Sequence, residues 1–355
     1  HLDEPVILGG KRLGPKAAKA LFEEMKIATQ RMTADAVKVD ADQPWTSPHA
    51  AELDRLTTAR WLRTLPVSRL CKLAVASQLA GNNGCGLGRQ SYLGNLTQVK
   101  AGGLEKYWTD SEVYHCRGGN QRLALKFAHA LGQRVRLETP VTGIQAKDGQ
   151  ATVHCATGES LTADDVVLTV PPSVWHRIRF EPELPHELRP QMGTVVKYLS
   201  VVDRRFWEGE HLGPNATTDG MVSMTWDATE GQPGTGAVLT AFSGGPAATV
   251  CRRRWSQDRD KAYREALEAL YPHYAKHCTA ACFMDWPGDP WTQAGYSFPA
   301  PGQVMTVGPI LQSGLGRLHF AGEHACYKFV GYMEGALSSG ISVARRIVVR
   351  ERGRR

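Results

Sequence analysis

The segment LHFAGEHACYKFVGYMEGALSSG, residues 318–340, places an acidic residue and several glycines where they could hold a bound group. A strand-like apolar run ends in a turn that carries Glu323, and a helix is expected to start around Gly331, with further glycines at 335 and 340. Glycines at a helix start permit close backbone approach, and free N–H groups at the positive end of the helix favour an electron-rich group. A glycine-rich helix packed tightly on a sheet is the structural alternative.

A lysine stands inside a second pattern, TVVKYLSVV at residues 194–202. The alternation of apolar and polar residues predicts a half-buried strand. A charged residue in such a strand needs either a solvent-exposed face or a chemical role. For Lys197 both interpretations stay open from the residues alone.

Composition and charge narrow the classes of protein. The 355 residues are 42% hydrophobic and 22% charged, as in an ordinary globular protein, and two domains are expected at this length. No apolar run reaches the ~20 residues that a membrane-spanning helix needs. The net charge of +7 is mild, and without a nucleic-acid-binding module it indicates surface charge. Among the eight cysteines only Cys278 and Cys282 lie close together, which predicts reduced thiols and no metal site.

The first hundred or so residues are expected to be largely helical. Apolar positions recur at helical spacing in residues 15–32 and 53–65, and the run CKLAVASQLAG ends on Gly81, a plausible helix stop. The pattern changes after Tyr114, where RGGNQRLALKFAHALG, residues 117–132, predicts a glycine turn that opens a helix.

Strands are expected to dominate after that helix. The strand-like runs are VRLETPVTGI (135–144), ATVHCA (151–156), VVLTV (166–170), TVVKYLSVV and AVLTAFS (237–243), with a helix in residues 259–274. A glycine turn, a helix and a strand make half of a nucleotide-binding α/β arrangement. However, no G-x-G-x-x-G turn follows a strand, and GCGLGR at 84–89 has the wrong spacing.

Taken together, these motifs resemble the flavin-containing amine oxidases, the family of monoamine oxidases and L-amino-acid oxidases. ADQPWTSPHAAELDRLT looks like the start of the family's helical domain, and GTVVKYLSVVDRRFW is similar to its lysine strand. RGGNQRLALKFAHAL with VRLETPVTGI looks like the central flavin-domain segment. DPWTQAGYSFPAPGQV and the closing segment look like the last flavin-binding block. The resemblance covers nearly all of the chain in the family's order.

The resemblance implies a catalytic group of three residues. In the family the lysine holds a water against N5 of the flavin, which assigns that role to Lys197. Tyr296 and Tyr332 match the two aromatic walls that flank the substrate amine, and an aromatic pair suits an amine by shape and by its quadrupole. Ordinary core tyrosines are the alternative. Trp291 is a third candidate for the substrate pocket, with a buried core tryptophan as its alternative.

The resemblance also implies an FAD site. The residues expected to contact the cofactor are Val141, near the adenine, and Gly322, Glu323, Gly331, Tyr332 and Met333, near the pyrophosphate, ribityl chain and isoalloxazine. Relatives that link flavin covalently carry a cysteine just before the first tyrosine. This chain has Gly295 there, so we expect non-covalent FAD.

One part of the family pattern is absent from the chain. Members begin with a βαβ unit that carries the G-x-G-x-x-G turn and grips the ADP half of FAD, whereas LGGKRLGP at 8–15 resembles the stretch just after that unit. Three explanations stay open: the unit belongs to a separate polypeptide, the chain is a fragment, or the protein has lost the unit. The first two explanations are favoured because the other flavin-side features are intact.

We therefore expect a mixed α/β fold in which an incomplete Rossmann-like FAD domain is interleaved with an amine-oxidase substrate domain. Substrate-side segments are predicted at 1–111, largely helical, and 182–292, and flavin-side segments at 112–181 and 293–355. The expected activity is FAD-dependent oxidative deamination of a primary amine or an L-amino acid, with hydride transfer to flavin N5, reduction of O2 to H2O2 and hydrolysis of the imine. The alternative is a flavin-free, non-catalytic subunit that keeps the fold as a scaffold.

The substrate is less well defined by the sequence. An L-amino-acid oxidase needs an arginine to pair with the substrate carboxylate, and Arg89 and Arg117 are candidates by location only. The expected partners are a small amine or amino acid, O2, and a companion polypeptide or a second copy of the chain. Nucleic acid and membrane are not expected as partners. We expect a cytoplasmic location.

Overall fold

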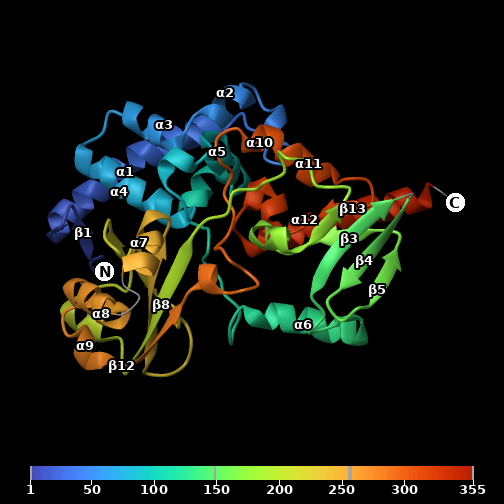
Figure 1. The fold of residues 1–355 in the computed structure, drawn as a ribbon. Helices are drawn as coiled ribbons and strands as arrows, with labels where there is room; N and C mark the ends of the chain where they lie inside the picture. Colours follow the sequence, from blue (N-terminus) through green and yellow to red (C-terminus); the bar gives the residue numbers. More distant parts are fainter. Residues whose placement is uncertain (1, 148, 255–257, 354–355) are drawn as a thin grey trace.

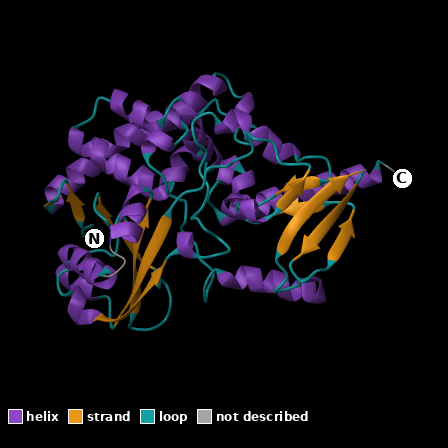
Figure 2. Cartoon of the chain, viewed as in Figure 1, coloured by secondary structure: helices purple, strands orange, loops and turns teal. Residues whose placement is uncertain are grey.

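The computed structural model describes residues 2–147, 149–254 and 258–353. Helices of the first hundred residues lie above a seven-stranded sheet, and a four-stranded sheet lies at the far side of the molecule (Figures 1 and 2). The fold is therefore mixed α/β, as the sequence predicts. Among the described residues, no helix combines the length and apolar character needed to cross a membrane, and no group of three or more metal-ligating side chains is found.

The helical region is built on one long helix and four shorter ones. They are α1 (Pro15–Ala36), α2 (Ala50–Arg55), α3 (Thr58–Thr64), α4 (Arg69–Asn82) and α5 (Tyr92–Ala101), with short turns η1 (Pro44–Thr46), η2 (Leu87–Arg89) and η3 (Leu104–Trp108). The continuous helix expected over residues 53–65 is wrong. Leu56 is extended, and the Thr57 hydroxyl accepts a hydrogen bond from the Arg60 amide, so Thr57 caps a new helix.

The seven-stranded sheet has the strand order β12-β8-β11-β10-β9-β1-β2. Its strands are β1 (Val6–Leu8), β2 (Lys11–Arg12), β8 (Val195–Val202), β9 (Ala216–Thr218), β10 (Met224–Asp227), β11 (Ala237–Gly244) and β12 (Cys278–Met284). The alternation predicted for β8 is observed: Tyr198 is buried and stacks on Tyr263, with ring centroids 4.5 Å apart. Lys197 therefore points to the opposite face.

Helices α7 (Pro246–Arg254), α8 (Arg259–Leu270) and α9 (Tyr274–His277) follow strand β11 in the chain, and the short turns η6 (Phe206–Glu210) and η7 (Trp286–Gly288) flank the sheet. The buried core on the Tyr198 side includes residues of all three helices. That side of the sheet is consequently closed by packing, and only the Lys197 side remains for a site.

Two smaller sheets lie outside the seven-stranded sheet. One has the order β5-β4-β3-β7 and the other pairs β13 with β6 in parallel. Their strands are β3 (Val141–Lys147), β4 (Gln150–Cys155), β5 (Ser160–Ala163), β6 (Val166–Leu168), β7 (Arg179–Glu181) and β13 (Leu318–Phe320). The strand expected over 135–144 begins only at Val141. The preceding Pro140 has no N–H to donate, and Glu138 adopts a left-handed backbone with φ 55°.

The remaining elements connect these sheets. They are α6 (Gln121–Leu131), η4 (Gly132–Arg134), η5 (Pro172–Arg177), α10 (Gln303–Thr306), α11 (Gly308–Ser313), η8 (Glu323–Ala325), η9 (Tyr327–Phe329) and α12 (Met333–Arg352). Helix α12 begins at Met333 and not at Gly331, because Gly331 has φ 85°, which a helix cannot accommodate. Helix α6 runs apart from the core (Figure 1) and contains no buried residue.

Close backbone contact joins the helical region to the large sheet. A Cβ atom on Gly244, at the end of β11, would lie 2.5 Å from the carbonyl oxygen of Gly81 in α4. Such a distance is sterically forbidden, and the obstacle is backbone that cannot move aside. By contrast, a Cβ atom on Gly340 in α12 would meet no atom within 4 Å.

These two glycines make a matched pair for a stability experiment. Gly340→Ala should raise the free energy of unfolding by about 0.5–1 kcal/mol, because alanine restricts the unfolded chain and is favoured in a helix. Gly244→Ala should lower it by about 1–3 kcal/mol, because it pushes α4 from the sheet. Urea unfolding measures both values. Equal effects of the two substitutions would contradict the contact described here.

Candidate active site

The open face of the large sheet carries Lys197. Phe242 stands opposite Lys197 on β11, and Met284 stands opposite it on β12. The Lys197 ammonium lies 5.3 Å from the centroid of the Trp226 ring, a cation–π contact. Lys197 is partly buried, and desolvation lowers the pKa of its ammonium. The structure thus gives Lys197 an aromatic partner that the sequence did not indicate.

Tyr296 reaches this region because glycines let its segment approach strand β8. A Cβ atom on Gly295 would lie 2.5 Å from Cγ2 of Val195, so only glycine fits there without displacing Val195. The Tyr296 carbonyl accepts a hydrogen bond from the Gly193 amide at 2.7 Å. Its hydroxyl donates to the carbonyl of Gly81 at 3.1 Å. Burial raises the pKa of the Tyr296 phenol, which therefore stays neutral.

A single, partly buried carboxylate joins the two tyrosine segments. Oε1 of Glu323 accepts from the Ser297 amide at 2.9 Å, and Oε2 accepts from the Ser297 hydroxyl at 2.8 Å and from the Gly331 amide at 2.7 Å. Burial raises the pKa of Glu323 despite these three donors. Both carboxylate oxygens are thus engaged with the protein itself.

Tyr332 follows Gly331 directly and precedes the first residue of α12. A Cβ atom on Gly331 would lie 3.3 Å from Cδ2 of Tyr296, so this glycine packs against the Tyr296 ring. The phenols of Tyr332 and Tyr107, in η3, influence each other's pKa, and burial raises the pKa of Tyr107 to about 12. The sequence did not single out Tyr107, because its role depends on a contact between distant segments.

An acidic residue of the loop after η3 also acts on this group. Glu112 has a left-handed backbone, φ 61°, and an exposed side chain. Desolvation raises the pKa values of Tyr107, Tyr296 and Tyr332, and the negative charge of Glu112 adds to that rise; at Lys197 the same charge opposes the lowering of the pKa by desolvation. A lone glutamate in a loop carries no sequence signal, so the motifs do not indicate Glu112.

The start of α12 offers donors to a bound group. Within the residues that the structure describes, the amides of Met333 and Glu334 form no hydrogen bond, and Tyr332 provides no side-chain cap. They lie at the positive end of a 20-residue helix. Gly322, with φ 131°, and Gly331, with φ 85°, adopt backbone conformations near this helix start that other residues rarely adopt. Free amides at a helix start suit an electron-rich group.

Two of the predicted site residues lie elsewhere. Trp291 is 60% exposed, and its described ring contact is with the guanidinium of Arg177, 5.1 Å from the ring centroid, rather than with either tyrosine. Val141 is partly buried at the start of β3, where it pairs with Cys155. Their assigned roles in the substrate pocket and at the adenine stay predictions.

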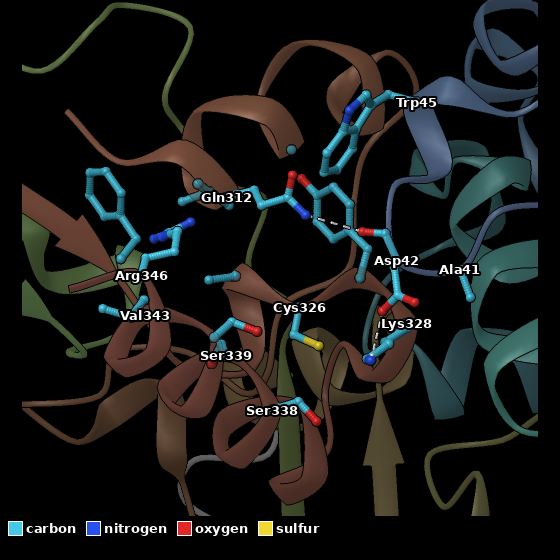
Figure 3. A pocket seen from close by; sticks show the side chains of 16 residues that line it. Ala41, Asp42, Trp45, Gln312, Cys326, Lys328, Ser338, Ser339, Val343 and Arg346 are labelled. Atoms are coloured by element: carbon cyan, nitrogen blue, oxygen red, sulfur yellow. Dashed lines mark hydrogen bonds and ion pairs between the residues drawn. The ribbon is translucent and has the colours of Figure 1, made fainter. Parts of the chain in front are cut away.

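A separate cavity lies between α11, α12 and the loop before η1 (Figure 3). It has a volume of about 90 Å³ and is lined in part by Asp42, Gln312, Cys326 and Arg346. The Lys328 ammonium donates to Asp42 at 2.7 Å at one side of it. None of Lys197, Tyr296 and Tyr332 lines this cavity, so it is distinct from the lysine–tyrosine group.

Comparison with known proteins matches the chain to one family. A profile of the flavin-containing amine oxidoreductases matches residues 25–348. Bovine amine oxidase [flavin-containing] A is 28% identical over 335 residues, which are 88% of this chain and 62% of the bovine enzyme. An L-amino acid dehydrogenase from Synechocystis is 26% identical over 353 residues, 94% of this chain and 72% of that protein. The chain thus spans less than two thirds of the bovine enzyme.

The fold has solved counterparts. The structure of putrescine oxidase bound to putrescine superimposes with a TM-score of 0.87 at 22% identity, and covers 98% of this chain and 81% of the putrescine oxidase chain. At that identity the similarity concerns the fold alone.

A buried histidine lies next to Glu323. His324 packs edge-on against Trp175, with centroids 5.7 Å apart, and its Nε2 has no partner among the described residues. Desolvation lowers the pKa of His324 to about 4. The unfolded chain therefore binds a proton at this histidine at a higher pH than the folded chain does.

The sign of this pKa shift predicts an acid-sensitive fold. The contribution of neutral His324 is present above pH ~6.5 and is lost as the pH falls toward 4, by about 2–3 kcal/mol. His324→Gln should therefore reduce the difference between the unfolding free energies at pH 7 and pH 4.5, measured by urea titration. His129→Gln, at an exposed site on α6, is the control. An unchanged pH difference in His324→Gln would refute the assignment.

Proposed function

The chain belongs to the flavin-containing amine oxidoreductase family, and from this premise we propose that it catalyses the FAD-dependent oxidation of a primary amine. The observation that supports the proposal is that the charge of Glu112 acts on Lys197, Tyr296 and Tyr332 alike, and that Tyr332 directly precedes the unbonded amides at the start of α12. When bound, FAD supplies the redox chemistry: a hydride equivalent leaves the α-carbon of the amine for flavin N5, O2 is reduced to H2O2, and water hydrolyses the imine.

The protein residues orient the amine in this proposal. Tyr296 and Tyr332 offer neutral aromatic faces to the substrate. Lys197, whose pKa is lowered by desolvation, holds a water near the reacting atoms. The amides of Met333 and Glu334 hold the flavin ring by its electron-rich edge.

The charges around the group favour an amine over an amino acid. Glu112 places a carboxylate near both tyrosines, and a carboxylate attracts an ammonium and repels a second carboxylate. We assign neither of the two candidate arginines to the binding of a substrate carboxylate. Arg89 is bonded to Gln191 at 3.0 Å, and Arg117 lies exposed in the loop before α6. An L-amino acid is the second candidate substrate, since one relative is an L-amino acid dehydrogenase.

Non-covalent binding of FAD is part of the proposal. A cysteine at 295 would bring its Cβ atom to 2.5 Å from Val195, so this position is closed to a flavin-linking side chain. The eight cysteines are free, which fits a reducing compartment, and we assign the protein to the cytoplasm on that basis.

The ADP half of FAD requires a dinucleotide-binding turn that the sequence of this chain lacks. This turn would be supplied by a companion polypeptide or by a segment of the full protein outside this sequence. On α6 and after it, large apolar side chains are exposed, among them Phe127 at 50% and Leu137 at 80%. A second copy of this chain is the other candidate for covering these surfaces.

The rival proposal, a flavin-free scaffold, is separated from the oxidase by cofactor binding. The oxidase is expected to be yellow as purified, or to gain flavin absorbance on titration with FAD together with any companion polypeptide that mass analysis identifies. Protein that stays colourless under both conditions would favour the scaffold.

Lys197→Met tests the role of the lysine. Turnover of the preferred amine by the FAD-loaded protein should fall about a hundredfold, while FAD remains bound, because the substitution removes a single positioned donor. Stopped-flow absorbance measures the rate, and Lys11→Met, at an exposed site on β2, is the control. Unchanged turnover would remove Lys197 from the mechanism.

Glu112→Gln tests the preference for a cationic substrate. The KM for the amine should rise about tenfold at low salt with little change in kcat, because the lost attraction acts on binding. Glu105→Gln, an exposed glutamate of η3, is the control for charge. An unchanged KM for the amine, or a lower one, would argue for an L-amino acid as the substrate.

A further inference from the structure

Glu323 differs from a surface glutamate in having three donors from two separate segments. The Ser297 amide and hydroxyl and the Gly331 amide all lie within 2.7–2.9 Å of its oxygens. Each donor residue is the direct neighbour of a tyrosine, since Ser297 follows Tyr296 and Gly331 precedes Tyr332. One carboxylate thus fixes the backbone on which both aromatic walls stand.

The backbone around Glu323 is held in place from α12. The Ser339 hydroxyl accepts from the Gly322 amide and donates to the Gly322 carbonyl, both at 2.9 Å. A Cβ atom on Gly335 would lie 3.4 Å from Cα of Glu323 and 2.3 Å from the Phe329 carbonyl. The first turn of α12 therefore packs closely against the backbone of Glu323, from which the bridging side chain extends.

We infer that Glu323 is a positioning residue that sets the separation of the Tyr296 and Tyr332 rings by bonding both of their backbone segments. We call the three hydrogen bonds of Glu323 to Ser297 and Gly331 the bridge. The effect of the bridge on catalysis rests on the proposed amine oxidation, whereas the existence of the bridge does not. This role differs from the FAD contact expected for Glu323, because both carboxylate oxygens accept hydrogen bonds from the protein itself.

A purely structural role for Glu323 would have different consequences. It would stabilise the loop between η9 and α12, and its loss would lower stability without a specific effect on the substrate. A positioning role predicts instead that the effect of Glu323 on catalysis depends on the two tyrosine rings being present.

Amide hydrogen exchange on the chain as it stands tests the bridge. In the unsubstituted protein the amides of Ser297 and Gly331 should be protected, although Gly331 lies outside any helix or strand. Glu323→Gln should speed exchange at both amides about tenfold or more, because glutamine keeps one acceptor oxygen and turns an NH2 group toward a donor. Glu334→Gln, an exposed glutamate at the start of α12, is the matched control and should leave both amides unchanged.

The outcomes decide the inference separately from the proposed function. An unprotected Gly331 amide in the unsubstituted chain would overturn the bridge, and this measurement holds even if Glu323→Gln does not fold. Faster exchange at only one of the two amides in Glu323→Gln would overturn it as well. Neither exchange measurement requires enzyme turnover. The absence of amine oxidation would therefore contradict the proposed function without contradicting the bridge.

Kinetics on the FAD-loaded protein test whether Glu323 acts on catalysis through the two tyrosines. Glu323→Gln should lower kcat/KM for the amine about tenfold, and the same substitution should have no further effect when Tyr296→Ala and Tyr332→Ala are already present. An equal loss in both backgrounds would show that Glu323 acts independently of the tyrosines and would overturn the positioning role.

Discussion

The carboxylate of Glu323 is the constraint around which the candidate site is arranged. Removing an anion from water, even in part, is costly unless donors replace the lost water, and three donors from two segments do so here. Satisfying one carboxylate therefore requires that the segments of Tyr296 and Tyr332 meet. The left-handed backbone of Gly331, whose amide is one of the donors, is part of the same arrangement.

Two glycines with no room for a side chain allow other segments to pack closely against the large sheet. Gly244 meets α4, and Gly295 meets Val195 on β8, each with a separation that a methyl group would close. At Gly244 backbone packs directly on backbone, whereas at Gly295 the backbone packs on the Val195 side chain. These contacts bring α4 and the Tyr296 segment against the large sheet that carries Lys197.

Elements with strong local patterns could be predicted from the sequence. The alternation in β8 and the run of β11 appear as expected, and the family is the one that the motifs resembled. Local patterns could not show that Thr57 would start a new helix or that the strand near Pro140 would begin late. Tyr107, Glu112 and Trp226 were missed because their roles depend on contacts between distant segments. The separate roles assigned to Trp291 and Val141 stay predictions.

The apolar surface of α6 has a consequence for the life of the protein. Helix α6 contains no buried residue, and the side chains of Leu125, Phe127 and Leu131 are about half exposed. Exposed apolar side chains invite self-association and capture by chaperones or proteases. Copies in which this surface is covered would escape that fate.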